Sequence, residues 1–272
     1  MTGGRPGATR RPPTLRMTLS SVTLNHIERA SRVIRGRIVR TPVLGLAGLP
    51  GLETGGLYLK AELFQRTGSF KPRGVLNKLA GLTPEERARG LLAVSSGNHA
   101  QAVAACAAEQ GLDCLLVMPE GASEQKAAAA ASYGATLDRS STTTSEAIAL
   151  AAELERMTGR VSIPAYDDAA VIAGQGTIGL ELLEQVPDLD TVVVPVSGGG
   201  LIAGIAVAVK ALRPGVRIVA VEPELAPTLA YALKAGYPVE LESRSRVDGL
   251  GAPSVGALCL ELCQQFGTSS VR

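Results

Sequence analysis

Residues 191–201 read Thr-Val-Val-Val-Pro-Val-Ser-Gly-Gly-Gly-Leu, an apolar run that ends in three consecutive glycines. The β-branched run is typical of a buried strand, and the apolar residues 201–212 have the composition and length of a helix. The glycines let the chain turn tightly and leave backbone N–H groups open at the positive end of that helix. The stretch therefore predicts a strand–turn–helix unit with an anion site at the turn, most naturally for a phosphate.

The same pattern recurs along the chain. Apolar runs at residues 91–94 and 114–118 each lead through a turn into a helical segment, and residues 217–221 form a further run. Continuous apolar strands that alternate with helices are typical of parallel sheets covered on both faces. The sequence thus predicts an α/β fold with mostly parallel sheets.

Composition restricts the classes of partner. The 272 residues include 27 basic and 25 acidic side chains, a net charge of +2, and only 3% aromatic residues, which does not favour a nucleic-acid partner. No apolar run is long enough to span a bilayer, and no signal peptide is recognisable. The four cysteines lack CxxC spacing. We therefore expect reduced cysteines, a cytoplasmic protein with no membrane partner, and a disordered tail at residues 1–18.

A lysine stands where a reactive amine would be held. Residues 68–74 read Gly-Ser-Phe-Lys-Pro-Arg-Gly and lie between a strand-like and a helix-like segment. Ser69 is the expected N-cap, and Pro72 suits the first helical turn. The positive end of the helix dipole disfavours a protonated amine, which lowers the pKa expected for Lys71 and suits a neutral nucleophile. Taken alone, such a heptapeptide would more often hold a surface lysine.

A second polar turn lies between a predicted strand and a predicted helix. Residues 95–99 read Ser-Ser-Gly-Asn-His, and helix capping explains one of these residues but not the cluster. The set could hold a carboxylate at the helix start and donate a hydrogen bond to a phenolate-like oxygen. One ligand would use all three sites. Pyridoxal phosphate carries an aldehyde for Lys71, a phosphate for the glycine turn and a ring hydroxyl for Asn98.

The glycine turn alone also permits another cofactor. Gly198, Gly200 and Ala203 match a dinucleotide fingerprint, and Glu222 follows about twenty residues later. An NAD-binding Rossmann protein is therefore an alternative. It leaves the lysine and the serine-rich turn without a function.

With these motifs, the chain resembles the fold-type II pyridoxal-phosphate enzymes, in the branch of the serine/threonine dehydratases (threonine ammonia-lyases) and serine racemases. Six segments carry the resemblance in family order, at residues 69–74, 95–101, 171–177, 197–201, 221–224 and 247–250. The resemblance implies a tryptophan synthase β-like fold of two woven three-layer α/β domains. Residues 19–82 and 168–272 would form a large cofactor domain, truncated at its C-terminal end. Residues 83–167 would form a small inserted domain.

The resemblance also implies roles for individual residues. Lys71 would form the Schiff base with the cofactor and then take the Cα proton of the substrate, with Ser96 as the acid/base on the opposite face. The residues matching the cofactor site are Phe70, Lys71, Asn98, Ser197, Gly198, Gly199, Gly200, Leu201 and Gly249. The residues matching the site of the substrate carboxylate are Ser95, Ser96, Asn98, His99 and Gln101.

Two regions depart from the family pattern. Some relatives bind a divalent cation through a Glu, a backbone carbonyl and an Asp. Glu222 and Ala226 match the first two, but Thr228 replaces the acid, so we expect no metal. In the family, a Ser or Cys on a later strand binds the pyridine nitrogen. Residues 267–272 do not resemble that strand, although one of their two serines could substitute.

The reaction that the resemblance implies is a pyridoxal-phosphate-dependent β-elimination through the Lys71 Schiff base. It would deaminate L-threonine or L-serine to a 2-oxo acid and ammonia, in a homodimer or homotetramer. A serine racemase, or a dehydratase of another β-hydroxy amino acid such as 3-hydroxyaspartate or a hydroxyectoine breakdown product, is an alternative. A truncated inactive homologue is an alternative of another class, and an NAD-binding Rossmann protein is the least favoured alternative.

Overall fold

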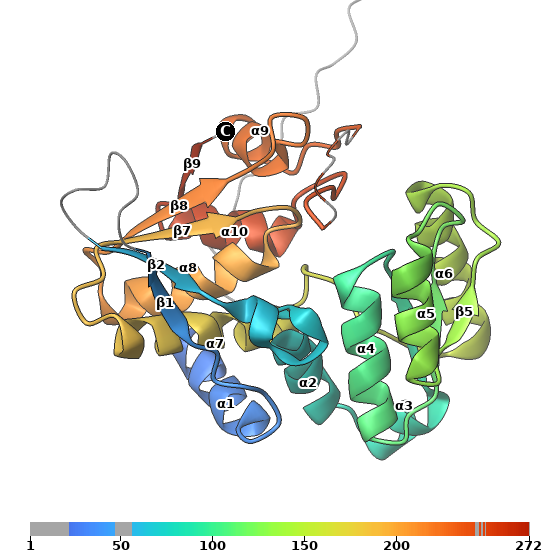
Figure 1. The fold of residues 1–272 in the computed structure, drawn as a ribbon. Helices are drawn as coiled ribbons and strands as arrows, with labels where there is room; N and C mark the ends of the chain where they lie inside the picture. The colour runs from blue at the N-terminus through green and yellow to red at the C-terminus, as the bar shows by residue number, and fades with distance from the viewer. Residues whose placement is uncertain (1–21, 47–55, 243–244, 246, 248, 272) are drawn as a thin grey trace, which may run out of the picture.

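The computed structural model describes residues 22–46, 56–242, 245, 247 and 249–271. The predicted tail at residues 1–18 lies outside these ranges. Within them, the strands form a two-stranded, a four-stranded and a three-stranded sheet. Figure 1 shows two lobes, one around each of the two larger sheets, with helix α2 (Lys71–Ala80) between them. The predicted α/β fold with mostly parallel sheets is confirmed.

The smaller lobe is a parallel sheet between two helix layers. Its elements are α3 (Pro84–Arg89), β3 (Leu91–Val94), α4 (Asn98–Glu109), β4 (Cys114–Val117), α5 (Glu124–Ser132), β5 (Thr136–Asp138), α6 (Thr144–Thr158) and β6 (Val161–Ser162). The strands are parallel in the order β5-β4-β3-β6. Leu91 and Leu116 share a core with α4 and α5, whereas Leu92 and Val117 pack against α6. Alternate residues thus face opposite helix layers, as in strands buried on both faces.

The larger lobe contains both ends of the described chain. Its elements are α1 (Leu24–Ile34), β1 (Val43–Leu46), β2 (Leu57–Lys60), η1 (Glu62–Phe64), η2 (Arg66–Gly68), α7 (Ala169–Gln185), β7 (Thr191–Pro195), α8 (Gly200–Leu212), β8 (Arg217–Val221), α9 (Thr228–Ala235), α10 (Ala257–Gln265) and β9 (Ser269–Val271). Strands β7, β8 and β9 are parallel in that order, and β1 and β2 form an antiparallel pair. The predicted strand–turn–helix unit at 191–201 is confirmed by β7 and α8.

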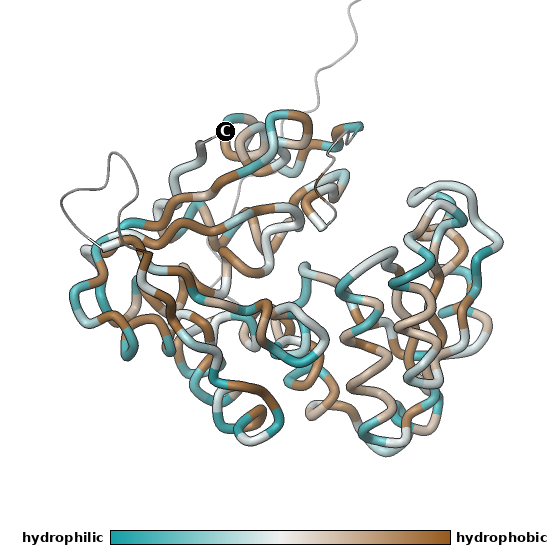
Figure 2. The backbone as a smooth tube through the Cα atoms, in the orientation of Figure 1, coloured by the Kyte–Doolittle hydropathy of each residue, from teal (hydrophilic) through white to brown (hydrophobic). Residues whose placement is uncertain are grey.

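The sheet of the larger lobe is covered unevenly. Val192 and Val194 of β7 lie in the core, but Val193 between them is 58% exposed. On β8, Val221 is 36% exposed. Figure 2 shows both strands as strongly hydrophobic. Among the described residues, one face of this sheet is therefore more exposed than the other. No helix in the described part of the chain is both long and apolar enough to cross a membrane.

Helix α7 packs directly against α2 and α8 because glycines face the neighbouring backbones. A Cβ on Gly174 would lie 2.5 Å from the carbonyl oxygen of Arg73, and a Cβ on Gly204 would lie 2.4 Å from that of Ile172. Apolar side chains of α2 also belong to the core of the smaller lobe. Helix α2 thus connects the two lobes, and the exact division into residues 19–82 plus 168–272 and 83–167 stays a prediction.

Candidate active site

Lys71 is the first residue of α2, and its amine is held by a distant backbone carbonyl. The Nζ donates to Ala165 O at 2.7 Å and lies 5.2 Å from the centroid of the Phe70 ring. Burial lowers the pKa of Lys71 from 10.5 to about 8. At pH 7 a pKa near 8 leaves about a tenth of the amine neutral. The lowered pKa agrees with the prediction, but burial is its main cause, whereas the sequence suggested the helix dipole.

The backbone before Lys71 differs from the expectation in one respect. The N-cap of α2 is Phe70 rather than Ser69, and Pro72 lies in the first turn as predicted. Ser69 is extended (φ −159°, ψ 164°), and its Oγ is buried without a hydrogen-bond partner among the described residues. Thr67 adopts a left-handed conformation (φ 62°), and its hydroxyl is also buried without a described partner. Two buried hydroxyls without a described partner thus precede Lys71 in the sequence, by four and by two residues.

The serine-rich turn joins β3 to α4 and brings polar groups to the start of that helix. Ser95 Oγ accepts a hydrogen bond from Gly97 N at 3.1 Å, which closes the turn, while Ser96 is exposed. Asn98 begins α4, and Gln101 lies one turn later; both are partly buried. The amides at this helix start are therefore the natural donors to a carboxylate.

The ring of His99 is engaged elsewhere. Its Nε2 lies 2.8 Å from Ile163 O, and because a carbonyl only accepts, Nε2 must carry the proton. The buried Nδ1 is then a bare acceptor with no partner in the described structure. Burial, with a smaller effect of Lys71, lowers the pKa of His99 to about 3. A neutral ring in this tautomer cannot donate to a substrate carboxylate, so a role of His99 at that carboxylate, which stays a prediction, would rest on its backbone amide.

The glycine turn is packed against Tyr166, a residue that carries no sequence signal for this role. A Cβ on Gly198 would lie 2.2 Å from Tyr166 Cδ1, and one on Gly200 would lie 2.9 Å from Tyr166 Cα. Gly199 has φ +93°, and its Cβ would lie 2.9 Å from Cys259 Cβ. Each glycine is therefore required by a close contact or by its conformation, independently of any ligand. The turn still presents the N-terminus of α8.

The remaining predicted cofactor residues differ in their surroundings. Ser197 Oγ accepts a hydrogen bond from Ala252 N at 2.9 Å and so fixes the end of the turn. Leu201 is partly buried in the first turn of α8. Gly249 has φ +92° and open space around the position of a Cβ. The structure brings the lysine, the serine-rich turn and the glycine turn together around residues 163–166.

Glu222 is a helix cap rather than a free carboxylate. Its oxygens accept hydrogen bonds from Leu229 N at 2.7 Å and Ala230 N at 2.8 Å, at the start of α9. Ser270 Oγ also donates to it, at 3.1 Å. In a dinucleotide-binding protein, the carboxylate of Glu222 would bind the ribose hydroxyls. Here it accepts hydrogen bonds from the amides of α9 instead, which argues against the NAD-binding alternative.

The other residues near Glu222 are similarly engaged. Thr228 Oγ1 donates to Ser197 O at 3.2 Å, and Ala226 O accepts from Thr228 N at 3.0 Å. Ser269 Oγ donates to Ile218 O at 3.4 Å. Among the described residues, no group of three His, Cys, Asp or Glu side chains could hold a metal ion.

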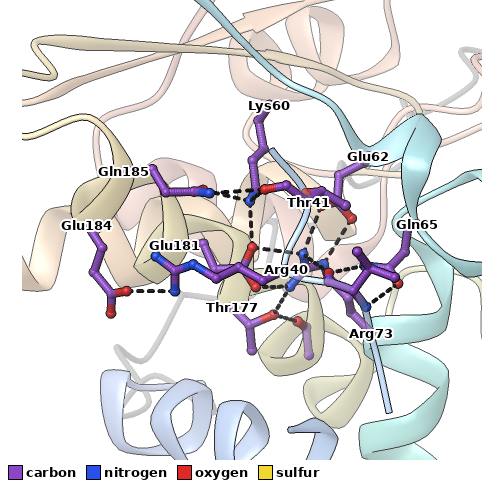
Figure 3. Close-up of polar contacts among 12 residues, drawn as sticks. Arg40, Thr41, Lys60, Glu62, Gln65, Arg73, Thr177, Glu181, Glu184 and Gln185 are labelled. Atoms are coloured by element: carbon purple, nitrogen blue, oxygen red, sulfur yellow. Dashed lines mark hydrogen bonds and ion pairs between the residues drawn. The ribbon is translucent and has the colours of Figure 1, made fainter. Parts of the chain in front are cut away.

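Helix α2 is anchored by a set of charges that we call the buried ionic cluster: Arg73, Lys60, Glu62 and Glu181. Arg73 is fully buried and donates to Glu62 at 2.8 and 2.9 Å and to Glu181 at 2.7 and 3.0 Å. Lys60 donates to Glu181 at 2.5 Å. Figure 3 shows these residues converging from β2, η1, α2 and α7. The two positive and two negative charges balance, which buried charges require.

The donor set fits pyridoxal phosphate. Lys71 supplies a buried amine with a lowered pKa, and Ser69 Oγ and His99 Nδ1 are buried polar atoms without described partners. The glycine turn at the start of α8 supplies an anion site. Lys71, Phe70 and Asn98 would hold the aldehyde and the ring, and residues 197–201 the phosphate.

Comparison with known proteins supports this assignment. Residues 34–272 match the family described as "Pyridoxal-phosphate dependent enzyme". The chain is 39% identical to the L-threonine ammonia-lyase of Thermotoga maritima over 246 residues, which are 90% of this chain and 61% of that protein. It is 40% identical to the catabolic L-threonine dehydratase of Escherichia coli, over 90% of this chain and 75% of that protein. Maize serine racemase superposes with a TM-score of 0.88 at 35% identity, over 92% of this chain and 76% of that chain.

Proposed function

Because the chain belongs to the family of pyridoxal-phosphate-dependent enzymes, we propose that it is an ammonia-lyase that deaminates L-threonine or L-serine to a 2-oxo acid and ammonia. The observation that carries the proposal is the buried amine of Lys71 at the start of α2, with a pKa of about 8. The two threonine-deaminating relatives, near 40% identity, support the choice of reaction.

The proposed chemistry needs few groups from the protein. When bound, the cofactor withdraws electrons from the substrate and makes its Cα–H bond acidic. Lys71 takes that proton as a neutral amine, which its lowered pKa favours. The Cα–H and Cβ–O bonds break and a Cα=Cβ double bond forms, the hydroxyl leaves as water with the proton that Lys71 took, and hydrolysis of the C–N bond gives the 2-oxo acid and ammonia.

The remaining residues bind and orient. Amides at the start of α4, with Ser95, Asn98 and Gln101, orient the substrate carboxylate, since the ring of His99 is engaged with Ile163 O. Residues 197–201 hold the phosphate at the N-terminus of α8. Phe70 and Gly249 lie beside the ring in this proposal.

Racemisation of serine is the second candidate. A serine racemase of Arabidopsis thaliana is 41% identical over 233 residues, and the maize structure is another relative of this kind. Ser96 would supply the second acid/base, and its exposed position at the turn permits proton exchange with water. Chiral analysis of the products from L-serine separates the two, because D-serine without pyruvate would exclude the ammonia-lyase.

The test is a keto-acid assay with added pyridoxal phosphate on L-threonine, L-serine and 3-hydroxyaspartate. We expect keto acid from threonine or serine and none from Lys71→Ala. Keto acid from 3-hydroxyaspartate alone would show that the proposed substrates, threonine and serine, are wrong. Purified protein with no chromophore and no product from any of these amino acids would indicate an inactive homologue.

We also propose a cytoplasmic homodimer or homotetramer. All four cysteines are free and buried, which fits a reducing compartment. Sedimentation equilibrium of the purified protein tests the oligomeric state.

A further inference from the structure

The chain returns from the smaller lobe to α7 through residues 163–168, which we call the return linker. Its carbonyls hold two candidate site residues: Ile163 O accepts from His99 Nε2 at 2.8 Å, and Ala165 O accepts from Lys71 Nζ at 2.7 Å. In Figure 1 this segment crosses between the lobes beside α2. The positions of both groups therefore depend on the path of the return linker.

The return linker also packs on the glycine turn. The ring of Tyr166 lies against Gly198, where a Cβ would be 2.2 Å from Cδ1. Tyr166 O accepts from Cys259 Sγ at 3.6 Å, and a Cβ on Gly199 would lie 2.9 Å from Cys259 Cβ. Tyr166, the glycine turn and α10 thus form one packed unit next to the carbonyl that holds Lys71.

Asp167 connects the return linker to the start of α10. Its carboxylate accepts hydrogen bonds from three successive amides at the start of α10, Ala257 at 3.1 Å, Leu258 at 3.0 Å and Cys259 at 3.3 Å. A Cβ on Gly256 would lie 2.3 Å from Asp167 Oδ1, so glycine is needed where the carboxylate approaches the helix. A helix N-cap normally comes from the residue next to the helix, but here it comes from 90 residues earlier.

We propose that Asp167 is a positioning residue for the reactive amine. By capping α10 it fixes the return linker, which keeps Ala165 O on the amine of Lys71 and Tyr166 on the glycine turn. Without the cap, the return linker separates from α10 and water reaches the amine. Because burial is what lowers the pKa of Lys71, that pKa then rises toward its ordinary value. The inference rests on the proposed function only for the role of Lys71.

The test measures the pH dependence of Lys71 reductive methylation in protein from which any bound pyridoxal phosphate has been removed, read from the mass of the Lys71 peptide. We expect the wild type to titrate near pH 8 and Asp167→Ala at least one pH unit higher. The methylation rate at pH 8 then falls about fivefold, in proportion to the neutral amine. Asp167→Asn, which keeps a capping oxygen, should restore most of the wild-type profile.

Thr143→Ala is the matched control. Thr143 caps α6 in the smaller lobe by accepting from Glu146 N at 3.1 Å, so this variant also loses a helix cap but away from Lys71. In this variant the midpoint of the Lys71 methylation profile should stay near pH 8. If Asp167→Ala keeps the wild-type profile while losing stability as Thr143→Ala does, Asp167 is only a structural cap and the proposal is wrong.

A second variant keeps the proposal testable if Asp167→Ala does not fold. Asp167→Ser keeps one capping hydroxyl and should show an intermediate shift; an unshifted profile in this folded variant also overturns the proposal. Failure of the proposed function can be distinguished from failure of the proposal on Asp167. A protein that makes no keto acid still yields the Lys71 profile, whereas a wild-type lysine that titrates near pH 10.5 contradicts the proposed function itself.

Discussion

Replacing Arg73 by Met tests whether the buried ionic cluster holds the helix that carries the lysine. The substitution keeps an unbranched stem but removes the guanidinium, which is fully buried and makes four hydrogen bonds of 2.7–3.0 Å to Glu62 and Glu181. Only Lys60 then remains to balance two carboxylates. Removing one partner of a buried ion pair costs about 3–5 kcal/mol, because it leaves an uncompensated buried charge. We expect the free energy of unfolding to fall by that amount at pH 7.

Urea unfolding of wild type and variant measures this loss, with an unchanged m-value as the sign that both unfold from similarly compact states. Arg40→Met is the control. Arg40 pairs with Glu184 at 2.7 Å, beside the cluster in Figure 3, but both side chains are more than half exposed. Exposed pairs contribute about 0–1 kcal/mol.

The dependence on pH gives a second check. Burial raises the pKa of Glu181, but hydrogen bonds from Arg73 and Lys60 outweigh it and lower that pKa overall. Without Arg73, the carboxylate protonates more easily, so the difference in stability between wild type and variant should shrink as the pH falls from 7 toward 4. A loss below 1 kcal/mol, or one equal to that of Arg40→Met, would refute the reasoning.

Three further predictions concern packing and protonation. Gly174→Ala puts a Cβ 2.5 Å from the backbone oxygen of Arg73 and should cost about 1–3 kcal/mol in thermal unfolding, whereas Gly215→Ala, with open space, should change little. Equal shifts in Tm would contradict the close helix contact. The stability of the wild type relative to Lys71→Met should rise between pH 8 and 10.5, because the folded protein releases the Lys71 proton at lower pH than the unfolded chain; a fall or a flat profile in denaturant titrations would count against the buried amine. The ring of His99 should keep the NMR shifts of its neutral form down to about pH 4, and a titration near pH 6.5 would show that the ring is not buried as described.

The sequence predicted those parts of the site that local pattern determines. An apolar run followed by glycines indicated β7 and the start of α8, because strand and helix periodicity are local properties. Lys71 was placed correctly at a helix start for the same reason. The sequence favours Ser69 as the cap because hydroxyls prefer that position, but Ser69 is extended and Phe70 is the N-cap of the helix.

Contacts between distant segments were not predictable. Lys71 and Ala165 are 94 residues apart, and a backbone carbonyl has no sequence signature. Tyr166 gave no signal that its ring would pack on the glycine turn. The charges of the buried ionic cluster resemble surface charges in the sequence, because only the fold shows that they are buried together. Likewise the burial that lowers the pKa of Lys71 is a property of the assembled lobes.

The central claim is that Lys71 is the amine that reacts with the cofactor. Its direct test is borohydride reduction of the protein incubated with pyridoxal phosphate, followed by mass mapping of the peptides. The account predicts one pyridoxyl adduct, on the peptide that contains Lys71, and its loss in Lys71→Ala. An adduct on Lys60 or Lys78 in place of Lys71, or a bound chromophore that persists unchanged in Lys71→Ala, would contradict it.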